Sequence, residues 1–260
     1  MIHEQDLIGD GRQVWAGGEW RYLTREKPAG ATLGLCGASP YSHEAVPIIP
    51  RSEWSAICKR KDAEQSWPKD FMDFHPLDQD GTNYCWCNAV VNAARCTRRR
   101  MGLPYADLSP ASVAAPIKGG ANQGGWGGEA LEYMIKNGVS TTDLWPANSR
   151  DTSKLTDAVK ESYRHFQVKE SYECKSFDEV ASAVMAGYAV FVGYSWWSHE
   201  VLITRIYETG GAFSVEIANS WGDWGTKNKW GIFGFQELSV SKGTNFDDAG
   251  FIYQMTAADK

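Results

Sequence analysis

The chain has 260 residues, of which 43% are hydrophobic and 22% are charged, as is usual for one large domain or two closely packed lobes. Its formal net charge of −6 argues against nucleic acid as the main partner, because surfaces that bind polyanions are rich in Lys and Arg. No stretch approaches the roughly 18 apolar residues of a membrane helix, so no membrane partner is expected. The first ten residues lack a positive region followed by an apolar one, so no secretory signal is expected.

Cysteine and histidine spacing gives no sign of a metal site or a cofactor, and we expect neither. The cysteines form no Cys-x-x-Cys pair, and the histidines show no zinc-finger spacing. We expect reduced thiols, which slightly favours a reducing compartment such as the cytoplasm, although the sequence leaves the location unknown. The six cysteines are Cys36, Cys58, Cys85, Cys87, Cys96 and Cys174.

Residues 1–46 are rich in Gly and Pro and are expected to form a turn-rich, β-containing N-terminal extension. Within them, the Gly17-Gly18 pair predicts a hairpin that sets Trp15 opposite Trp20. Three roles remain open for this extension. It is an accessory element, a cover that docks into the chain's own cleft, or a docking segment for a larger assembly.

From Ile49 onward the pattern changes and predicts three helices. Small and apolar residues predict a buried helix over 85–100. A second helix is expected over 128–137, where Asn137-Gly138 ends it, and a third over 177–187 after Ser176.

Four strands are expected in the second half of the chain, over 189–194, 200–207, 213–218 and 231–235. Helices come first and strands later, which indicates an α+β fold with two lobes in residues 47–260. We expect the helical lobe at about 68–145 and the β-rich lobe at about 146–260.

Cys85, His199 and Asn219 follow one another in an order that suits a thiol nucleophile, its base and a group that orients the base. A cysteine is a useful nucleophile only when its surroundings hold it as thiolate. The alternatives are an inert core cysteine, a core histidine and a turn asparagine. His165 lies in a charged stretch and is expected on the surface.

Four segments, in order, resemble the papain family of cysteine peptidases (peptidase family C1), and the resemblance covers about four-fifths of the chain, from roughly Ile49 to the C-terminus. It implies a papain-like two-lobe fold, with the active-site cleft between a helical lobe and a β-barrel-like lobe, and a peptide or protein substrate. The segments are Gln79 with Cys85-Trp86, Gln123-Gly124-Gly125-Trp126-Gly127, Gly138-Val139 with Trp145-Pro146, and Ser198-His199 with Asn219-Ser220-Trp221-Gly222.

The resemblance also implies a role for each matched residue. Cys85 would attack from a helix N-terminus, which would lower its pKa, with His199 as base and Asn219 as orienting group. The Gln79 amide and the Cys85 N–H would bind the oxyanion, and Trp221 would cover the His199–Asn219 bond, with Trp86 supporting the site. The implied substrate-binding residues are Gly124, Gly125, Trp126, Trp197, Ser198 and Glu200.

The chain departs from the family pattern near two of these residues. Thr82-Asn83-Tyr84 stands where the family usually has Cys-Gly-Ser, which removes a common disulfide of the first lobe. Glu200 replaces a small residue; its carboxylate would raise the imidazole pKa, favour a basic substrate side chain, or point away along the strand. The stretch from Cys85 to His199 is shorter than the roughly 130–150 residues of papain-like enzymes, which predicts a more open site.

Three functions fit these features. The first is a cysteine peptidase that acts through a Cys85 thiolate–His199 imidazolium pair and an acyl-enzyme. The second is a catalytically silent papain-like module that binds peptides or has a structural role. The third is another Cys-His-Asn acyl transferase or amidase. A reactive Cys85 without peptide turnover would favour the third, and an unreactive Cys85 would favour the second.

Overall fold

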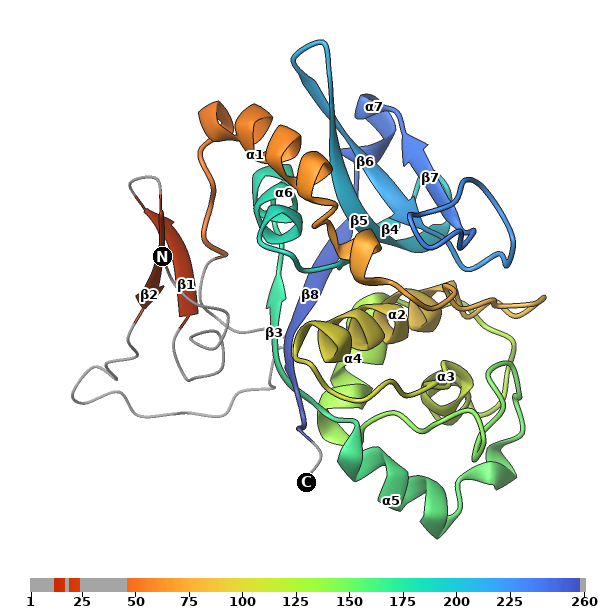
Figure 1. Cartoon of the computed structure of the whole chain (residues 1–260). Helices are drawn as coiled ribbons and strands as arrows, with labels where there is room; N and C mark the ends of the chain where they lie inside the picture. Colours follow the sequence, from red (N-terminus) through yellow and green to blue (C-terminus); the bar gives the residue numbers. More distant parts are fainter. Residues whose placement is uncertain (1–11, 17–18, 24–45, 258–260) are drawn as a thin grey trace.

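The computed structural model describes residues 12–16, 19–23 and 46–257 (Figure 1). Strands β1 (Arg12–Ala16) and β2 (Glu19–Leu23) pair antiparallel with Trp15 opposite Trp20, so the predicted hairpin register is confirmed. The predicted turn residues Gly17 and Gly18 lie outside the described residues, as does Cys36.

The β-rich part is a six-stranded antiparallel sheet with the strand order β3-β8-β4-β5-β6-β7. Three of the four predicted strands are confirmed, as β4, β5 and β6. The strands are β3 (Val168–Glu173), β4 (Val190–Tyr194), β5 (His199–Thr209), β6 (Ala212–Ala218), β7 (Phe235–Leu238) and β8 (Asp248–Met255).

The strand predicted over 231–235 is wrong, because β7 begins only at Phe235. Gly231 and Gly234 have φ angles of 77° and 112°, which lie in the left-handed region and interrupt an extended chain. The Asn228 side chain also accepts the backbone N–H groups of Trp230 and Ile232 and closes a turn there.

The helical part surrounds α2 (Cys85–Arg100), which is buried along most of its length because its side chains are small. All three predicted helices are confirmed, as α2, α4 and α6. Gly138 ends α4 with a φ of 111°, and a Cβ there would lie 2.0 Å from the Tyr163 carbonyl oxygen. Figure 1 shows α2 beside α3 (Ala111–Lys118) and α4 (Gly127–Lys136), with α5 (Asp157–His165) farther from it.

The sequence did not predict α1 (Arg51–Glu64), which lies beside α6 (Phe177–Met185) over the sheet (Figure 1). Trp54 anchors α1. Its indole N–H donates to the Ile49 carbonyl at 2.8 Å, and its ring packs edge-on against Phe213 at 5.0 Å. The described chain also contains short turns of helix, η2 (Pro68–Phe71), η3 (Thr152–Lys154) and α7 (Val240–Gly243).

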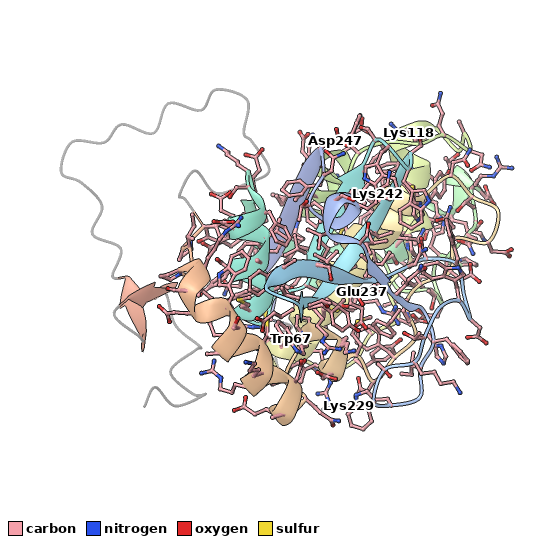
Figure 2. All side chains as sticks on the ribbon, turned by 90° about the horizontal axis from the view of Figure 1, so that it is seen from above. Trp67, Lys118, Lys229, Glu237, Lys242 and Asp247 are labelled. Atoms are coloured by element: carbon pink, nitrogen blue, oxygen red, sulfur yellow. The ribbon has the colours of Figure 1, made fainter. Side chains whose placement is uncertain are left out.

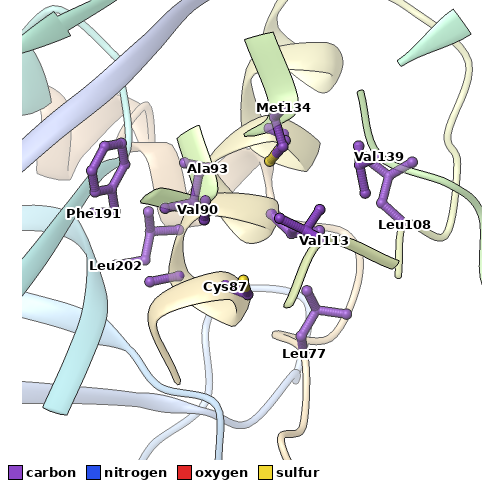
Figure 3. Close-up of a cluster of buried hydrophobic side chains, with 14 of the residues drawn as sticks. Leu77, Cys87, Val90, Ala93, Leu108, Val113, Met134, Val139, Phe191 and Leu202 are labelled. Carbon is purple, nitrogen blue, oxygen red and sulfur yellow. The ribbon is translucent and has the colours of Figure 1, made fainter. Parts of the chain in front are cut away.

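Two hydrophobic cores lie on opposite faces of the sheet, because successive strand side chains point to opposite sides. Phe191 and Leu202 enter the core around α2, where Figure 3 shows them near Val90 and Ala93. Their neighbours in β4 and β5, such as Val192, enter the other core with Trp54 of α1. The sheet is therefore covered by α2 on one face and by α1 and α6 on the other.

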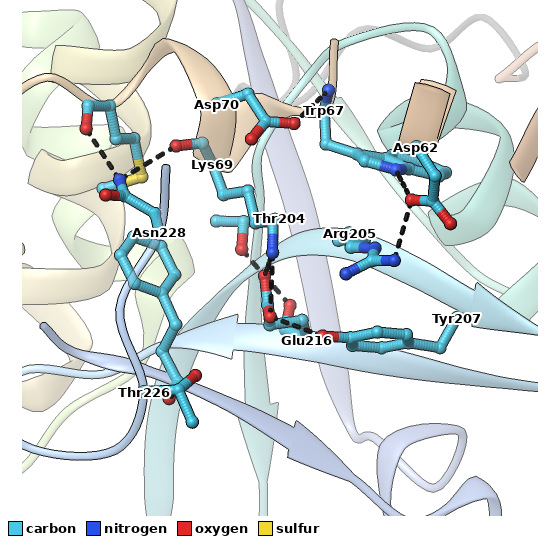
Figure 4. A network of polar contacts seen from close by, with 12 residues as sticks. Asp62, Trp67, Lys69, Asp70, Thr204, Arg205, Tyr207, Glu216, Thr226 and Asn228 are labelled. Atoms are coloured by element: carbon cyan, nitrogen blue, oxygen red, sulfur yellow. Dashed lines mark hydrogen bonds and ion pairs between the residues drawn. The ribbon is translucent and has the colours of Figure 1, made fainter. Parts of the chain in front are cut away.

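A polar network ties α1 and η2 to strands β5 and β6 (Figure 4). The buried Glu216 carboxylate pairs with the Lys69 ammonium group at 2.9 Å and accepts the Tyr207 hydroxyl at 2.7 Å. Asp62 bridges Arg205 at 2.8 Å and the Trp67 indole at 2.7 Å. Buried charges are stable when they are paired in this way.

Charged side chains such as Lys229, Glu237 and Lys242 lie on the outside of this half of the molecule, whereas Trp67 is buried (Figure 2). Among the described helices, none combines the length and the apolar character that a membrane crossing requires.

Candidate functional site

His199 and Asn219 are brought together by the pairing of β5 with β6. His199 is the first residue of β5, and Asn219 follows the last residue of β6. The imidazole Nε2 lies 2.7 Å from the Asn219 Oδ1. Because an amide oxygen can only accept, Nε2 carries the proton, and Nδ1 is the nitrogen able to accept one.

Cys85 is the first residue of α2 and is half-buried. The backbone N–H groups of Glu200 and Trp86 act on its sulfur and lower the pKa of the thiol. Glu200 follows His199 in β5, and α2 packs against this strand, so the thiol lies near its start. The site thus joins the start of α2 to the start of β5.

Burial raises the pKa of the Cys85 thiol; the Glu200 N–H opposes this rise, and the Glu200 carboxylate adds to it. The expected lowering of this pKa by the helix N-terminus is therefore outweighed. Burial also lowers the pKa of His199, against the effect of the Asn219 bond. Both shifts favour the uncharged forms of the two groups at rest.

Gln79, in the turn before α2, is bonded to the residue that follows Asn219. Its Oε1 accepts the Ser220 hydroxyl at 2.8 Å, and its backbone N–H donates to the Ser220 carbonyl at 3.0 Å. Its Nε2 donates to the Thr82 carbonyl at 2.7 Å, which leaves the second amide N–H for another acceptor. We did not predict this use of Ser220, although it lies within the Asn-Ser-Trp-Gly segment.

Two indoles enclose the His199 imidazole. The Trp221 ring is stacked on it at 4.8 Å and 27°, and the Trp197 ring meets it at 4.8 Å and 67°. Trp221 is itself 40% exposed, so it lies between the imidazole and solvent. Ser198, which lies between Trp197 and His199 in the chain, is exposed in a turn and has a φ of 51°. The sequence did not single out Trp224, which packs against Trp221 at 5.3 Å.

The glycine segment before α4 lies against Trp86. A Cβ on Gly125 would lie 2.8 Å from the buried Trp86 ring, so a larger residue does not fit there. A Cβ on Gly124 would meet no atom within 4 Å. Trp126 is 54% exposed beside them, and the Trp86 indole donates to the Gln123 carbonyl at 3.4 Å. Gly124 therefore offers an open stretch of backbone.

Glu200 points inward and not along the strand into solvent. It is 4% exposed, and its Oε2 accepts the Gly127 N–H at 2.9 Å. Its Oε1 is buried and has no hydrogen-bond partner among the described residues. Burial raises the pKa of this carboxyl well above its usual range; the charge of Asp248 adds to the rise, and the Gly127 N–H opposes it.

Outside this cluster, His165 lies on the surface at the end of α5, as expected. Within the described chain, no group of three or more His, Cys, Asp or Glu side chains is placed to hold a metal ion. The described cysteines are all free thiols, namely Cys58, Cys85, Cys87, Cys96 and Cys174.

Two curated relatives resemble this chain in sequence. Cathepsin L 1 of Paramecium tetraurelia is 26% identical over 202 residues, and Cathepsin L 2 of the same organism is 26% identical over 226 residues. The matches cover 69% and 78% of this chain, and they span 60% and 68% of the relatives. No protein-family model matches the chain.

Solved structures resemble its fold. Digestive procathepsin L 3 of the Tenebrio molitor larval midgut superposes with a TM-score of 0.56 at 16% identity, over 70% of this chain and 66% of that one. The proform of the ragweed pollen cysteine protease Amb a 11 gives 0.52 at 20%, over 69% and 61%. A structure from a study of the mite allergens Blo t 1 and Der p 1 gives 0.54 at 16%, over 73% and 68%. The expected α+β papain-like fold is thereby confirmed.

Proposed function

Because the chain is a relative of the papain-like cysteine peptidases of family C1, we propose that it hydrolyses peptide bonds in peptide or protein substrates. Cys85 would be the nucleophile, His199 the base and Asn219 the group that orients the base. The observation that carries this proposal is the 2.7 Å contact between His199 Nε2 and Asn219 Oδ1, at the start of the strand that packs on α2, whose first residue is Cys85.

The proposed reaction begins with proton transfer from the Cys85 thiol to His199 Nδ1, which creates the thiolate–imidazolium pair. The thiolate attacks the peptide carbonyl, and the free amide N–H of Gln79 and the Cys85 backbone N–H stabilise the oxyanion. His199 then protonates the leaving amine and later activates the water that hydrolyses the thioester.

The proposed substrate cleft lies between a helical lobe at about 68–145 and a β-rich lobe at about 146–260. A bound peptide would pair with the backbone of Gly124 and Gly125 as an added strand. Trp126 would flank it on one side, and Trp197 and Ser198 would line the other. The buried Glu200 would act on the substrate only through its bond to Gly127. The open position at Gly124 supports this arrangement, since a Cβ there would meet no neighbour.

One observation favours a second candidate, a papain-like module that binds peptides without cleaving them. Burial and the Glu200 carboxylate raise the pKa of Cys85, which works against thiolate formation. In such a module the same cleft would hold a peptide, and Cys85 would remain protonated.

Turnover of a mixed fluorogenic peptide library under reducing conditions tests the peptidase. Cys85→Ala should lower the rate at least about a thousandfold while the circular dichroism spectrum is unchanged. Cys96→Ala, at a half-buried thiol of the same helix, is the matched control and should retain activity. Normal turnover by Cys85→Ala would refute the assignment, and a folded but inactive native protein would favour the binding module.

A further inference from the structure

Glu200 is a buried carboxyl whose second oxygen is left without a hydrogen bond. Oε2 accepts the Gly127 N–H, whereas Oε1 is buried without a partner among the described residues. No ion pair of the described chain involves this carboxyl. The nearby cation Lys118 pairs with Glu129 at 2.6 Å. An unpaired buried carboxylate is costly, and this cost is why burial raises the pKa of the Glu200 carboxyl.

We propose that Glu200 is a positioning residue, which holds the N-terminus of α4 against β5 by a hydrogen bond and whose ionisation opposes thiolate formation at Cys85. The inference rests on the proposed function only in taking Cys85 as the reactive thiol. Glu200 occupies a position where papain-like sequences prefer a small residue, and the proposal gives this difference a physical role.

The hydrogen bond between Gly127 and Glu200 meets a need at the start of α4. The first N–H groups of a helix have no partner within it, and the side chain at the N-cap of α4 makes no capping bond. Glu200 supplies the acceptor from β5, at 2.9 Å from the Gly127 nitrogen. A Cβ on Gly127 would lie 2.0 Å from Glu200 Oε1, so any larger residue there would displace the carboxyl.

This contact fixes the substrate segment against the base. Gly124 and Gly125 lie just before α4, and His199 lies just before Glu200. A bond between Glu200 and Gly127 therefore sets the spacing between the proposed substrate strand and the imidazole. Losing the bond should loosen substrate binding more than the chemical step.

The effect of ionising Glu200 depends on the acidic groups and thiols around its carboxyl. Asp248 of β8 acts on Glu200, and Glu200 acts on the Cys85 and Cys87 thiols of α2. Glu129 of α4 adds a further negative charge at Cys87. Ionisation of Glu200 and ionisation of Cys85 therefore oppose each other, and the two groups titrate as a coupled pair.

The test is the alkylation rate of Cys85 by iodoacetamide between pH 6 and 10, located by mass spectrometry. Glu200→Gln retains an acceptor for Gly127 and removes the charge, so the pH midpoint should fall by about one unit, equivalent to about a tenfold faster reaction near neutral pH. Glu200→Asp retains the charge, so its midpoint should stay high. Glu132→Gln, at an exposed position of α4, is the control.

An unchanged midpoint in a folded Glu200→Gln protein would overturn the proposal. If that variant fails to fold, a fall of the midpoint in Glu200→Asp would overturn it equally, because the charge is still present. Glu200→Ala should lower Tm and raise KM more than it lowers kcat. Alkylation needs no peptide turnover, so a lowered midpoint without turnover would refute only the proposed peptidase.

Discussion

The His199 side chain is held by one hydrogen bond and two indoles, and the hydrogen bond determines which ring nitrogen can take a proton. Asn219 Oδ1 accepts from Nε2 and also from the Ser220 N–H at 2.8 Å, so the amide is fixed as well as the imidazole. Trp221 and Trp197 limit rotation of the ring. Asn219 would thus orient the imidazole and take no part in bond making.

Asn219→Ala should therefore lower kcat by about 10- to 100-fold and leave KM nearly unchanged, because the base remains but its orientation is lost. Steady-state kinetics on a cleaved peptide measure both constants. A loss as large as that of Cys85→Ala would contradict a purely orienting role.

The sequence was sufficient to nominate Cys85, His199 and Asn219, because each lies in a short segment with a recognisable neighbour. It could not decide the direction of the Glu200 side chain. On a strand, that direction depends on what lies opposite, and here the N-terminus of α4 lies opposite. The role of Ser220 as a partner of Gln79 depends in the same way on two segments far apart in the chain.

Among the elements, α1 shows why a helix was missed. Its buried positions are Trp54, Ile57, Cys58 and Lys61, which follow the helical spacing of one face. A lysine fills the last of these positions, and the remaining residues are largely charged, so the apolar stripe is short and narrow. The docking of Trp54 against Phe177 and Phe213, and not local propensity, accounts for the helix.

Lys61 makes α1 sensitive to pH. Its ammonium group donates to the Ser66 carbonyl at 3.0 Å and lies over the Trp67 ring, and burial lowers its pKa to about 8 from an ordinary 10.5. The unfolded chain therefore binds more protons between these values, so this group adds stability as pH rises from 8 to 10.5. At pH 7 the cost of burying the charge is present in full.

Lys61→Met removes that cost. The stability of the variant relative to the native protein should be highest at pH 7 and should fall by roughly 2 kcal/mol on going to pH 10. Urea unfolding at the two pH values measures the change. Lys59→Met, at an exposed position of the same helix, should show no such trend. If the stability of Lys61→Met relative to the native protein is the same at pH 7 and pH 10, the burial of a charged amine is contradicted.

Only part of the sheet was predicted, because local sequence patterns do not show which distant strands pair. Strands β4, β5 and β6 contain apolar runs and are adjacent in both sequence and space. Strand β8 comes last in the chain but lies between β3 and β4. That insertion depends on pairing across long sequence separations, which a local pattern does not encode.

On the scale of the whole molecule, two contacts join the helical part to the sheet at the candidate site. Gln79, in the turn before α2, bonds to Ser220, and Glu200 of β5 bonds to Gly127 of α4. Behind them, α2 packs on the sheet through a continuous apolar core. The thiol and the imidazole thus come from different parts of the fold, and these contacts determine their relative position.

The central claim is that Cys85 and His199 act together, and labelling the intact protein with an epoxysuccinyl probe tests it most directly. Mass spectrometry would map the modified thiols in the native protein and in His199→Ala. We expect Cys85 to be modified much faster than Cys96, and we expect this difference to disappear in His199→Ala. If Cys85 of the folded native protein reacts no faster than Cys96, the account of the site is contradicted.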